Sequence, residues 1–242
     1  MNLTWHIIRK DITRNRWGLL LWSVGLGYLI VQSGAGFPKY PDYLGVAALL
    51  VVLVLGVGLV ADIVQVDHPA SDAASWRTMP ISGRRMVLSK FLMLAAVFVA
   101  LPVGITVLRN VFGTTQSMRN FREYSAFTLL FSTVTFSVAA TAACTRNLLQ
   151  CLLLWIVLVF GAVTLGEFLG RFAPALTRPQ LFRMGLDKVF LVLGLSLATG
   201  LAVMFNQYVR RRAGLSVLLL LAGAVGTATI TAFWGYFYFY HA

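Results

Sequence analysis

The sequence predicts an all-α integral membrane protein that crosses the bilayer about seven times. Hydrophobic residues make up 59% of its 242 residues and charged residues only 12%, about half the charged fraction of an average soluble domain. The uncharged residues gather into seven runs, each 18 to 30 residues long. A helix needs about 20 mostly apolar residues to cross the hydrocarbon core, and these runs lack the alternation of a β-barrel. We therefore expect a polytopic transmembrane helical bundle, formed by residues 1–242 as a single transmembrane domain.

Each of the seven runs is free of Asp, Glu, Lys and Arg, and we expect one span in each. The runs are Trp17–Pro38, Tyr43–Ala61, Phe91–Leu108, Tyr124–Thr145, Asn147–Gly166, Val189–Val209 and Ala213–Ala242. The first run follows a basic segment, as the apolar part of a signal peptide does, but it is too long and ends without a clear cleavage pattern. We expect it to be retained as the first span.

The basic residues indicate how the chain is oriented. Lys and Arg number 20 against 8 acidic residues, which gives a net charge of +12. These residues lie in the short connections, where topology and anionic lipid explain them, so we expect membrane lipid and no nucleic acid as a partner. With the N-terminus inside, 12 basic residues lie on the inner side and 8 on the outer side. This bias predicts a multi-pass protein of the cell inner (plasma) membrane with a cytoplasmic N-terminus.

Residues 1–16 predict a short amphipathic helix that lies in the inner interface before the first span. Trp5, Ile8 and Ile12 are spaced at i, i+3 and i+7 and form one apolar stripe, and Trp17 adds an interfacial anchor. The alternative is a plain basic flank that only orients the first span.

The longest inner connection, residues 62–90, predicts a cytoplasmic docking element. Pro69 and Pro80 bracket a stretch of good helix formers, which predicts a helix of two to three turns between them. A turn follows, and Arg84 and Arg85 lead into the third span.

The outer connection, residues 167–188, is too polar to cross, and its two prolines favour two short surface helices. Acidic residues stand at the ends of two spans. We expect Asp62 to pair with inner basic groups and Glu167 to pair with Arg171 at i, i+4. A proton-coupled role for such acids is the alternative.

No pattern typical of a catalytic or metal site is found in the sequence. His6 and His68 lie outside the seven runs, and His241 stands at the very end of the last one. Cys144 and Cys151 have no metal-ligand spacing, so we expect small buried hydrophobic roles for both cysteines. There is no GxSxG, HExxH or GxxxxGK[ST] motif. We expect no enzyme activity, no cofactor and no metal, and any ATP hydrolysis must come from another polypeptide.

Several short motifs together resemble the membrane subunit, or permease, of type-2 ABC exporters. That family has an N-terminal elbow helix, an acidic end to the second span, a cytoplasmic coupling helix and a P-[IV]-S-[RG]…K passage into the third span. The residues that carry the resemblance are Trp5–Trp22 with Arg9–Asp11, Asp62, Ser75–Trp76–Arg77, Pro80–Gly83 and Ser89–Lys90. The resemblance covers residues 1–95, and the remainder is similar by hydropathy alone.

The resemblance implies a permease that forms the translocation path, pairs as a homodimer or with a second permease, and docks a separate P-loop ATPase. The elbow would comprise Trp5, Ile8, Ile12 and Trp17, and the ATPase-binding residues would be Ser75, Trp76, Arg77, Pro80, Arg84 and Arg85. The family core has six spans, so Ala213–Ala242 would be an extra C-terminal span. The few polar groups in the spans favour an amphipathic substrate, such as a lipid, a peptide or a small drug.

A second interpretation belongs to another functional class: a non-transporting accessory or assembly subunit of a larger membrane complex. The small residues, the extra span and the lack of a catalytic constellation suit such packing. Membrane enzymes and proton-coupled carriers are further alternatives.

Overall fold

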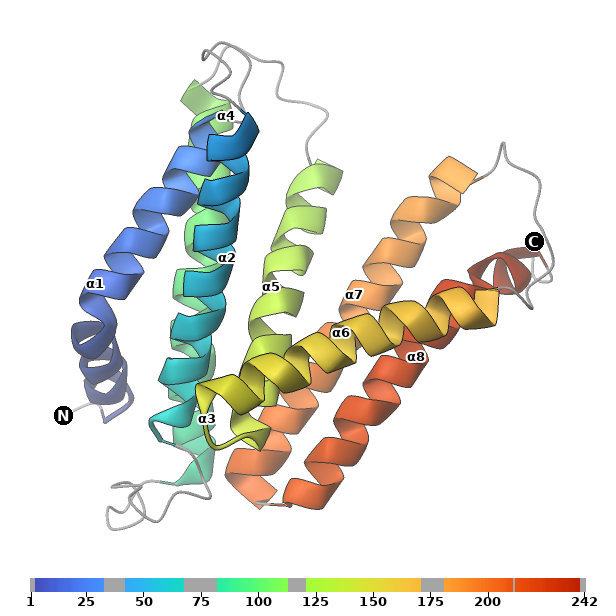
Figure 1. Cartoon of the computed structure of the whole chain (residues 1–242). Coiled ribbons are helices and arrows are strands. Elements are labelled where there is room, and N and C mark those ends of the chain that lie inside the picture. The colour runs from blue at the N-terminus through green and yellow to red at the C-terminus, as the bar shows by residue number, and fades with distance from the viewer. Residues whose placement is uncertain are drawn as a thin grey trace.

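The computed structural model describes residues 3–32, 42–67, 82–112, 121–170, 181–210 and 212–239, and nearly all of them are helical (Figure 1). No strand is present in these ranges. The elements are α1 (Leu3–Gln32), α2 (Asp42–Gln65), α3 (Gly83–Leu94), η2 (Ala95–Ala100), α4 (Leu101–Phe112), α5 (Phe121–Cys144), α6 (Leu148–Gly170), α7 (Leu181–Phe205), η5 (Asn206–Arg210) and α8 (Ala213–Phe239).

Several helices have the length and apolarity of membrane spans, which confirms a multi-pass helical membrane protein. Within the described ranges, five stretches meet both requirements: Ala47–Gln65, Gly83–Leu108, Leu148–Leu165, Phe190–Arg210 and Ala213–Ala232. The apolar part of α5, Thr128–Cys144, is shorter than a full span. Crossings by α1 and α5, and thus the count of seven, remain predictions.

The helices form two groups that meet at α5 (Figure 1). One group contains α1, α2 and the continuous helix made of α3, η2 and α4, while α7 and α8 pack together on the other side of α5. Helix α6 runs obliquely across the bundle and packs mainly on α8. An aromatic contact within the first group joins Trp22 of α1 to Phe98 of η2, with ring centroids 4.8 Å apart. A second contact joins the group to α5, with the Phe91 and Phe136 ring centroids 5.1 Å apart.

The third span is longer than the sequence indicates and changes its helical pitch midway. It starts at Gly83, eight residues before the expected start at Phe91, so the last part of the expected connection 62–90 is helical. In η2 the chain forms a wider π-type turn, in which the Leu101 N–H donates to the Ala96 carbonyl. Pro102 follows directly and has no N–H to donate, a combination that commonly bends helices.

Helix α1 runs without a break through both the expected elbow and the start of the expected first span. Trp5 and Trp17 are exposed, as interfacial anchors would be, and Ile12 is partly exposed. The face of α1 that packs against the bundle is instead marked by the buried Ile7 and Asp11. Whether the first turns of α1 lie in the membrane plane remains a prediction.

One end of the bundle collects most of the described charged residues. The first turns of α1, the end of α2, the start of α3, the α5–α6 turn and the η5–α8 turn all lie at this end (Figure 1). We call it the basic end, because exposed arginines lie on each of these elements except α2. They include Arg9, Arg84, Arg85, Arg146, Arg210 and Arg212.

Candidate functional site

A fully buried lysine lies at the basic end of the bundle. The Lys90 side chain has no solvent exposure, although it stands only about two turns into α3. Its ammonium nitrogen lies 2.7 Å from a carboxylate oxygen of Asp11, 2.8 Å from one of Asp67 and 2.7 Å from the Ile63 carbonyl oxygen. An ammonium group carries three protons, so three oxygens complete its coordination.

The two carboxylates come from different elements and are themselves almost fully buried. Asp11 lies on α1 and Asp67 directly after α2, and their side chains are 2% and 5% exposed. Lys10, at the solvent edge, lies 3.6 Å from Asp67, so two positive charges balance two negative ones. Burial raises the pKa of the Asp11 carboxyl above its ordinary value, against the opposing effect of the Lys90 charge. We call Asp11, Asp67 and Lys90 the ionic cluster.

The cluster also completes the C-terminal end of α2. The last carbonyls of a helix have no partner within the helix, and a side-chain donor commonly supplies one. Lys90 donates to the Ile63 carbonyl, and the buried Tyr208 hydroxyl donates to the Val64 carbonyl at 2.9 Å. Gln65 donates to the Thr145 hydroxyl at 3.2 Å. The end of α2 is thereby bonded to α3, η5 and the α5–α6 turn.

The start of α3 is shaped to bring Lys90 into this position. Ser82 caps the helix, and its hydroxyl accepts a hydrogen bond from the Arg85 N–H at 3.4 Å. Gly83 lies directly against the Tyr208 backbone, where a Cβ atom would overlap the Tyr208 carbonyl oxygen. Glycine at this position therefore permits α3 to approach η5 closely enough to seal the cluster.

The ionic cluster links three helices through buried ion pairs. We call residues 68–81 the coupling segment. Asp67 directly precedes it, Lys90 lies nine residues after its end, and both are paired within the cluster that includes Asp11 of α1. Removing one partner of a buried ion pair leaves an uncompensated charge, which costs about 3–5 kcal/mol. The cluster therefore holds the end of α2, the start of α3 and the first turns of α1 together.

The residues predicted to bind an ATPase are only partly covered by the structure. Ser75, Trp76, Arg77 and Pro80 lie outside the described residues. Arg84 and Arg85 are exposed in the first turn of α3. Asp62 lies 3.5 Å from Arg14, so the expected pairing of Asp62 with an inner basic group is confirmed. The predicted pairing of Glu167 with Arg171 also falls outside the described side chains.

The ionic cluster was not singled out from the sequence. Asp11 and Lys90 were named only as parts of the motifs that carry the family resemblance, and Asp67 lies in a connection rich in charge, where it resembles an ordinary flanking residue. One local signal was present: Lys90 directly precedes the apolar run Phe91–Leu108, and Asp11 lies four residues after Ile7, on the same face of a helix. Their mutual pairing could not be read from the sequence, because 79 residues separate Asp11 from Lys90.

The cysteines have structural surroundings. Cys151 is buried, as predicted, with its sulfur 3.5 Å from the Thr141 hydroxyl, and Cys144 is partly buried. Among the described residues, no three His, Cys, Asp or Glu side chains are grouped so that they could hold a metal ion.

The chain matches no protein-family model, no curated protein and no solved structure. Its function must therefore be argued from its own residues.

Proposed function

We propose that the chain is the permease subunit of an ATP-driven exporter similar to the type-2 ABC exporters. In this proposal it forms the translocation path and docks a separate P-loop ATPase through the coupling segment and the two arginines that follow it. The observation that carries the proposal is the ionic cluster, which joins Asp67, before the coupling segment, and Lys90, after it, to Asp11 of α1 in a water-excluded position.

The cluster supports this role because a transporter must convert a push at its cytoplasmic surface into movement of its spans. A flexible connection would absorb such a push. Here Asp67 directly precedes the coupling segment, Lys90 lies in the second turn of α3, and the two are 2.8 Å apart. The end of α2 and the start of α3 are thus held to each other and to α1, and movement of an attached ATPase would reorient α1, α2 and α3 as one body.

Charge and exposure at the basic end suit a docked partner. Arg84 and Arg85 project from the first turn of α3 and are exposed. Arginine offers a planar set of five hydrogen-bond donors that pairs well with carboxylates. Together with Trp76 and Arg77 of the coupling segment, these two arginines would supply the kind of anchor residues that dominate protein interfaces. An acidic groove on the ATPase is the matching surface.

The finer architecture belongs to the same proposal. We expect seven spans in the inner (plasma) membrane, with the basic end and the N-terminus in the cytoplasm and an interfacial elbow formed by the first turns of α1. Two permease chains, identical or paired, would bind two ATPase subunits.

The proposal is tested by purifying the chain from its native host in mild detergent and identifying the proteins that accompany it. We expect a P-loop ATPase to co-purify with the wild type and to be lost from the Trp76→Ala/Arg77→Ala double variant. Truncation of such anchors often costs about 2 kcal/mol or more each, which is enough to release a partner on washing.

Matched controls make this result specific. Arg146→Ala removes an exposed charge at the same end but outside the coupling segment, and it should keep the ATPase. All variants should insert into the membrane in equal amounts. The proposal is wrong if the wild type never carries a P-loop ATPase, or if the double variant retains its full complement.

A second candidate function is an accessory subunit of a larger membrane complex, and helix α6 favours it. Only 6% of the apolar stretch Leu148–Leu165 is buried within the chain, which leaves a long apolar face for lipid or for a neighbouring subunit. The same purification separates the two candidates, because an accessory subunit would bring down membrane proteins and no ATPase.

A further inference from the structure

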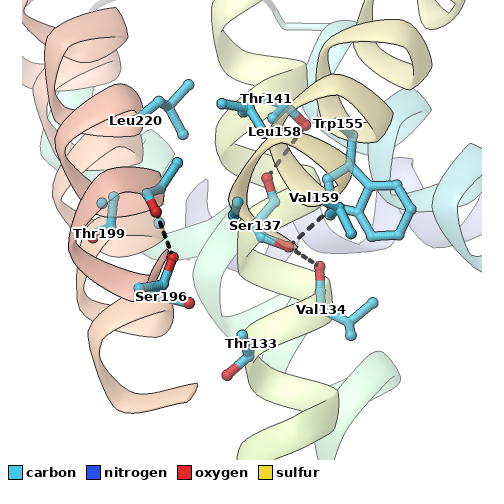
Figure 2. Close-up of a pocket in the computed structure, with 15 residues that line it drawn as sticks. Thr133, Val134, Ser137, Thr141, Trp155, Leu158, Val159, Ser196, Thr199 and Leu220 are labelled. Carbon is cyan, nitrogen blue, oxygen red and sulfur yellow. Dashed lines mark hydrogen bonds between the residues drawn. The ribbon is translucent and has the colours of Figure 1, made fainter. Parts of the chain in front are cut away.

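A cavity of about 380 Å³ lies among α5, α6, α7 and α8. Its volume falls within the range of small-molecule binding sites, about 300–1,000 Å³. Figure 2 shows Ser196 and Thr199 on one side of the space and Ser137 with Trp155 on the other. Four separate helices thus build a hollow that is partly open to its surroundings.

The wall of the cavity excludes charged ligands. Its apolar part includes Leu158, Val159, Leu220 and the Trp155 ring, and none of the described residues that line it carries a charge. A carboxylate or an ammonium group placed there would have no counter-charge, and burying an unpaired charge is costly. The ligand must therefore be uncharged and largely apolar.

The polar groups of the wall narrow the choice of ligand further, because most of their donors already have acceptors within the protein. The Trp155 N–H donates to the Ser137 hydroxyl oxygen at 3.2 Å, and the Ser137 hydroxyl donates to the Val134 carbonyl at 2.9 Å (Figure 2). The other hydroxyls with known partners also donate to backbone carbonyls: Thr133 to Leu193, Thr141 to Val138, Ser196 to Val192 and Thr227 to Ala224.

A hydroxyl group has one donor and two acceptor lone pairs. With five of the six lining hydroxyls donating to backbone carbonyls, the cavity presents acceptor lone pairs from several directions. A ligand that donates a hydrogen bond can satisfy them, whereas a ligand with acceptors alone, such as an ether or a ketone, has only the Thr199 hydroxyl as a donor.

We infer that this cavity binds one uncharged, single-chain amphiphile with a hydroxyl head group, drawn from the bilayer. The acyl or alkyl chain lies along the apolar wall, and the head group donates to Ser137, Ser196 or a neighbouring hydroxyl. That the bound amphiphile is also the exported substrate rests on the proposed function, whereas its binding in the cavity does not.

The test uses the full chain alone, without any ATPase, in nanodiscs of a diacylphosphatidylcholine. The probe is ω-bromododecanol, whose bromine quenches tryptophan fluorescence at short range. We expect a saturable quenching component in the wild type that is lost from Trp155→Phe, because Trp155 lines the cavity. Unlabelled dodecanol should displace the probe. Dodecyl methyl ether, dodecane and dodecanoate should do so at least about five-fold less well, the ratio expected for one net hydrogen bond.

A matched pair of variants locates the site. Ala224→Leu fills the cavity from α8, whereas Ala222→Leu adds the same atoms to an exposed position on the same helix. We expect saturable quenching to vanish in the first and to persist in the second. Ala162→Leu, which fills the cavity from α6, repeats the test if Ala224→Leu lowers the thermal midpoint of unfolding.

The outcomes are separable from those of the ATPase purification. Equal displacement by dodecane and dodecanol, or equal quenching in the Ala224→Leu and Ala222→Leu variants, overturns the inference. So does strong quenching of Trp155 by phosphatidylcholine with brominated chains that dodecanol cannot displace, since ordinary lipid tails would then occupy the cavity. Binding without a co-purifying ATPase would leave the site valid and the transport proposal wrong.

Discussion

The Lys90 ammonium nitrogen lies 2.8 Å from a carboxylate oxygen of Asp67, across the coupling segment that separates the two residues in sequence. Both side chains are almost completely buried, and the pair is completed by Asp11 of α1. The ionic cluster therefore joins α1, the end of α2 and the start of α3 at the basic end of the bundle.

Removing the buried cation should destabilise the protein strongly. In Lys90→Met, Asp11 and Asp67 keep their charges but lose the group that compensates them, which predicts a loss of about 3–5 kcal/mol in the free energy of unfolding. Unfolding of the purified chain in mild detergent, followed by circular dichroism, measures this. Arg85→Met on the exposed side of the same helix should change stability by less than about 0.5 kcal/mol.

A triple variant distinguishes charge from packing. When Asp11 and Asp67 are replaced by leucine together with Lys90→Met, no buried charge is left uncompensated, since Lys10, which loses its partner Asp67, is half-exposed. Much of the lost stability should therefore return. If the triple variant is as unstable as Lys90→Met, the loss does not arise from the unpaired carboxylates.

Asp11 should make stability depend on pH. Because burial raises its pKa, the folded protein holds the Asp11 proton more readily than the unfolded chain does. The stability contributed by this proton is fully present below the ordinary carboxyl pKa and is lost as pH rises through the folded-state value. The thermal midpoints of unfolding of the wild type and of Asp11→Asn are measured from about pH 4 to about pH 8. We expect the midpoint of the wild type to fall relative to that of Asp11→Asn as the pH rises. A constant difference across this range would contradict the pKa shift.

Gly83 should be intolerant of a side chain. In Gly83→Ala the new methyl group meets the Tyr208 carbonyl, so α3 must move away from η5, with an expected cost of about 1–3 kcal/mol. Gly214→Ala is the matched control, because it stands in the first turn of α8 with nothing within 4 Å of the added Cβ. The same unfolding measurement applies to both. Equal stability of the two variants would show that α3 and η5 do not pack as described.

The orientation can be tested by single-cysteine labelling in a background without Cys144 and Cys151. Cysteines at Arg9, Arg85, Arg146 and Arg212, all exposed and at the basic end, should react with an impermeant maleimide only after the cells are permeabilised. A cysteine at the exposed Phe168, near the far end of α6, should react in intact cells. Labelling of position 85 in intact cells would reverse the orientation. Opposite accessibility of positions 9 and 85 would mean that α1 and α2 do not both cross the membrane.

The helical membrane architecture could be predicted from local composition alone. Runs such as Asn147–Gly166 hold no charge over the length of a span, and in lipid only a helix satisfies their backbone. The pairing of Asp62 with an inner basic residue also followed from the surplus of arginine near the span ends. The helix expected between Pro69 and Pro80 stays a prediction, because those residues lie outside the described ranges.

The ionic cluster and the cavity were decided by tertiary structure. From its neighbours in sequence, Lys90 resembles an ordinary charged residue at the end of a span. It is buried because α1, α2 and α3 meet around it, and its partner Asp11 is 79 residues away in sequence. The cavity likewise needs four helices to close around it, and its selectivity depends on the direction in which each hydroxyl donates. Helix formation is governed by neighbouring residues, whereas burial and polar pairing depend on which distant helices meet. That physical difference separates what this sequence determines on its own from what only the assembled bundle determines.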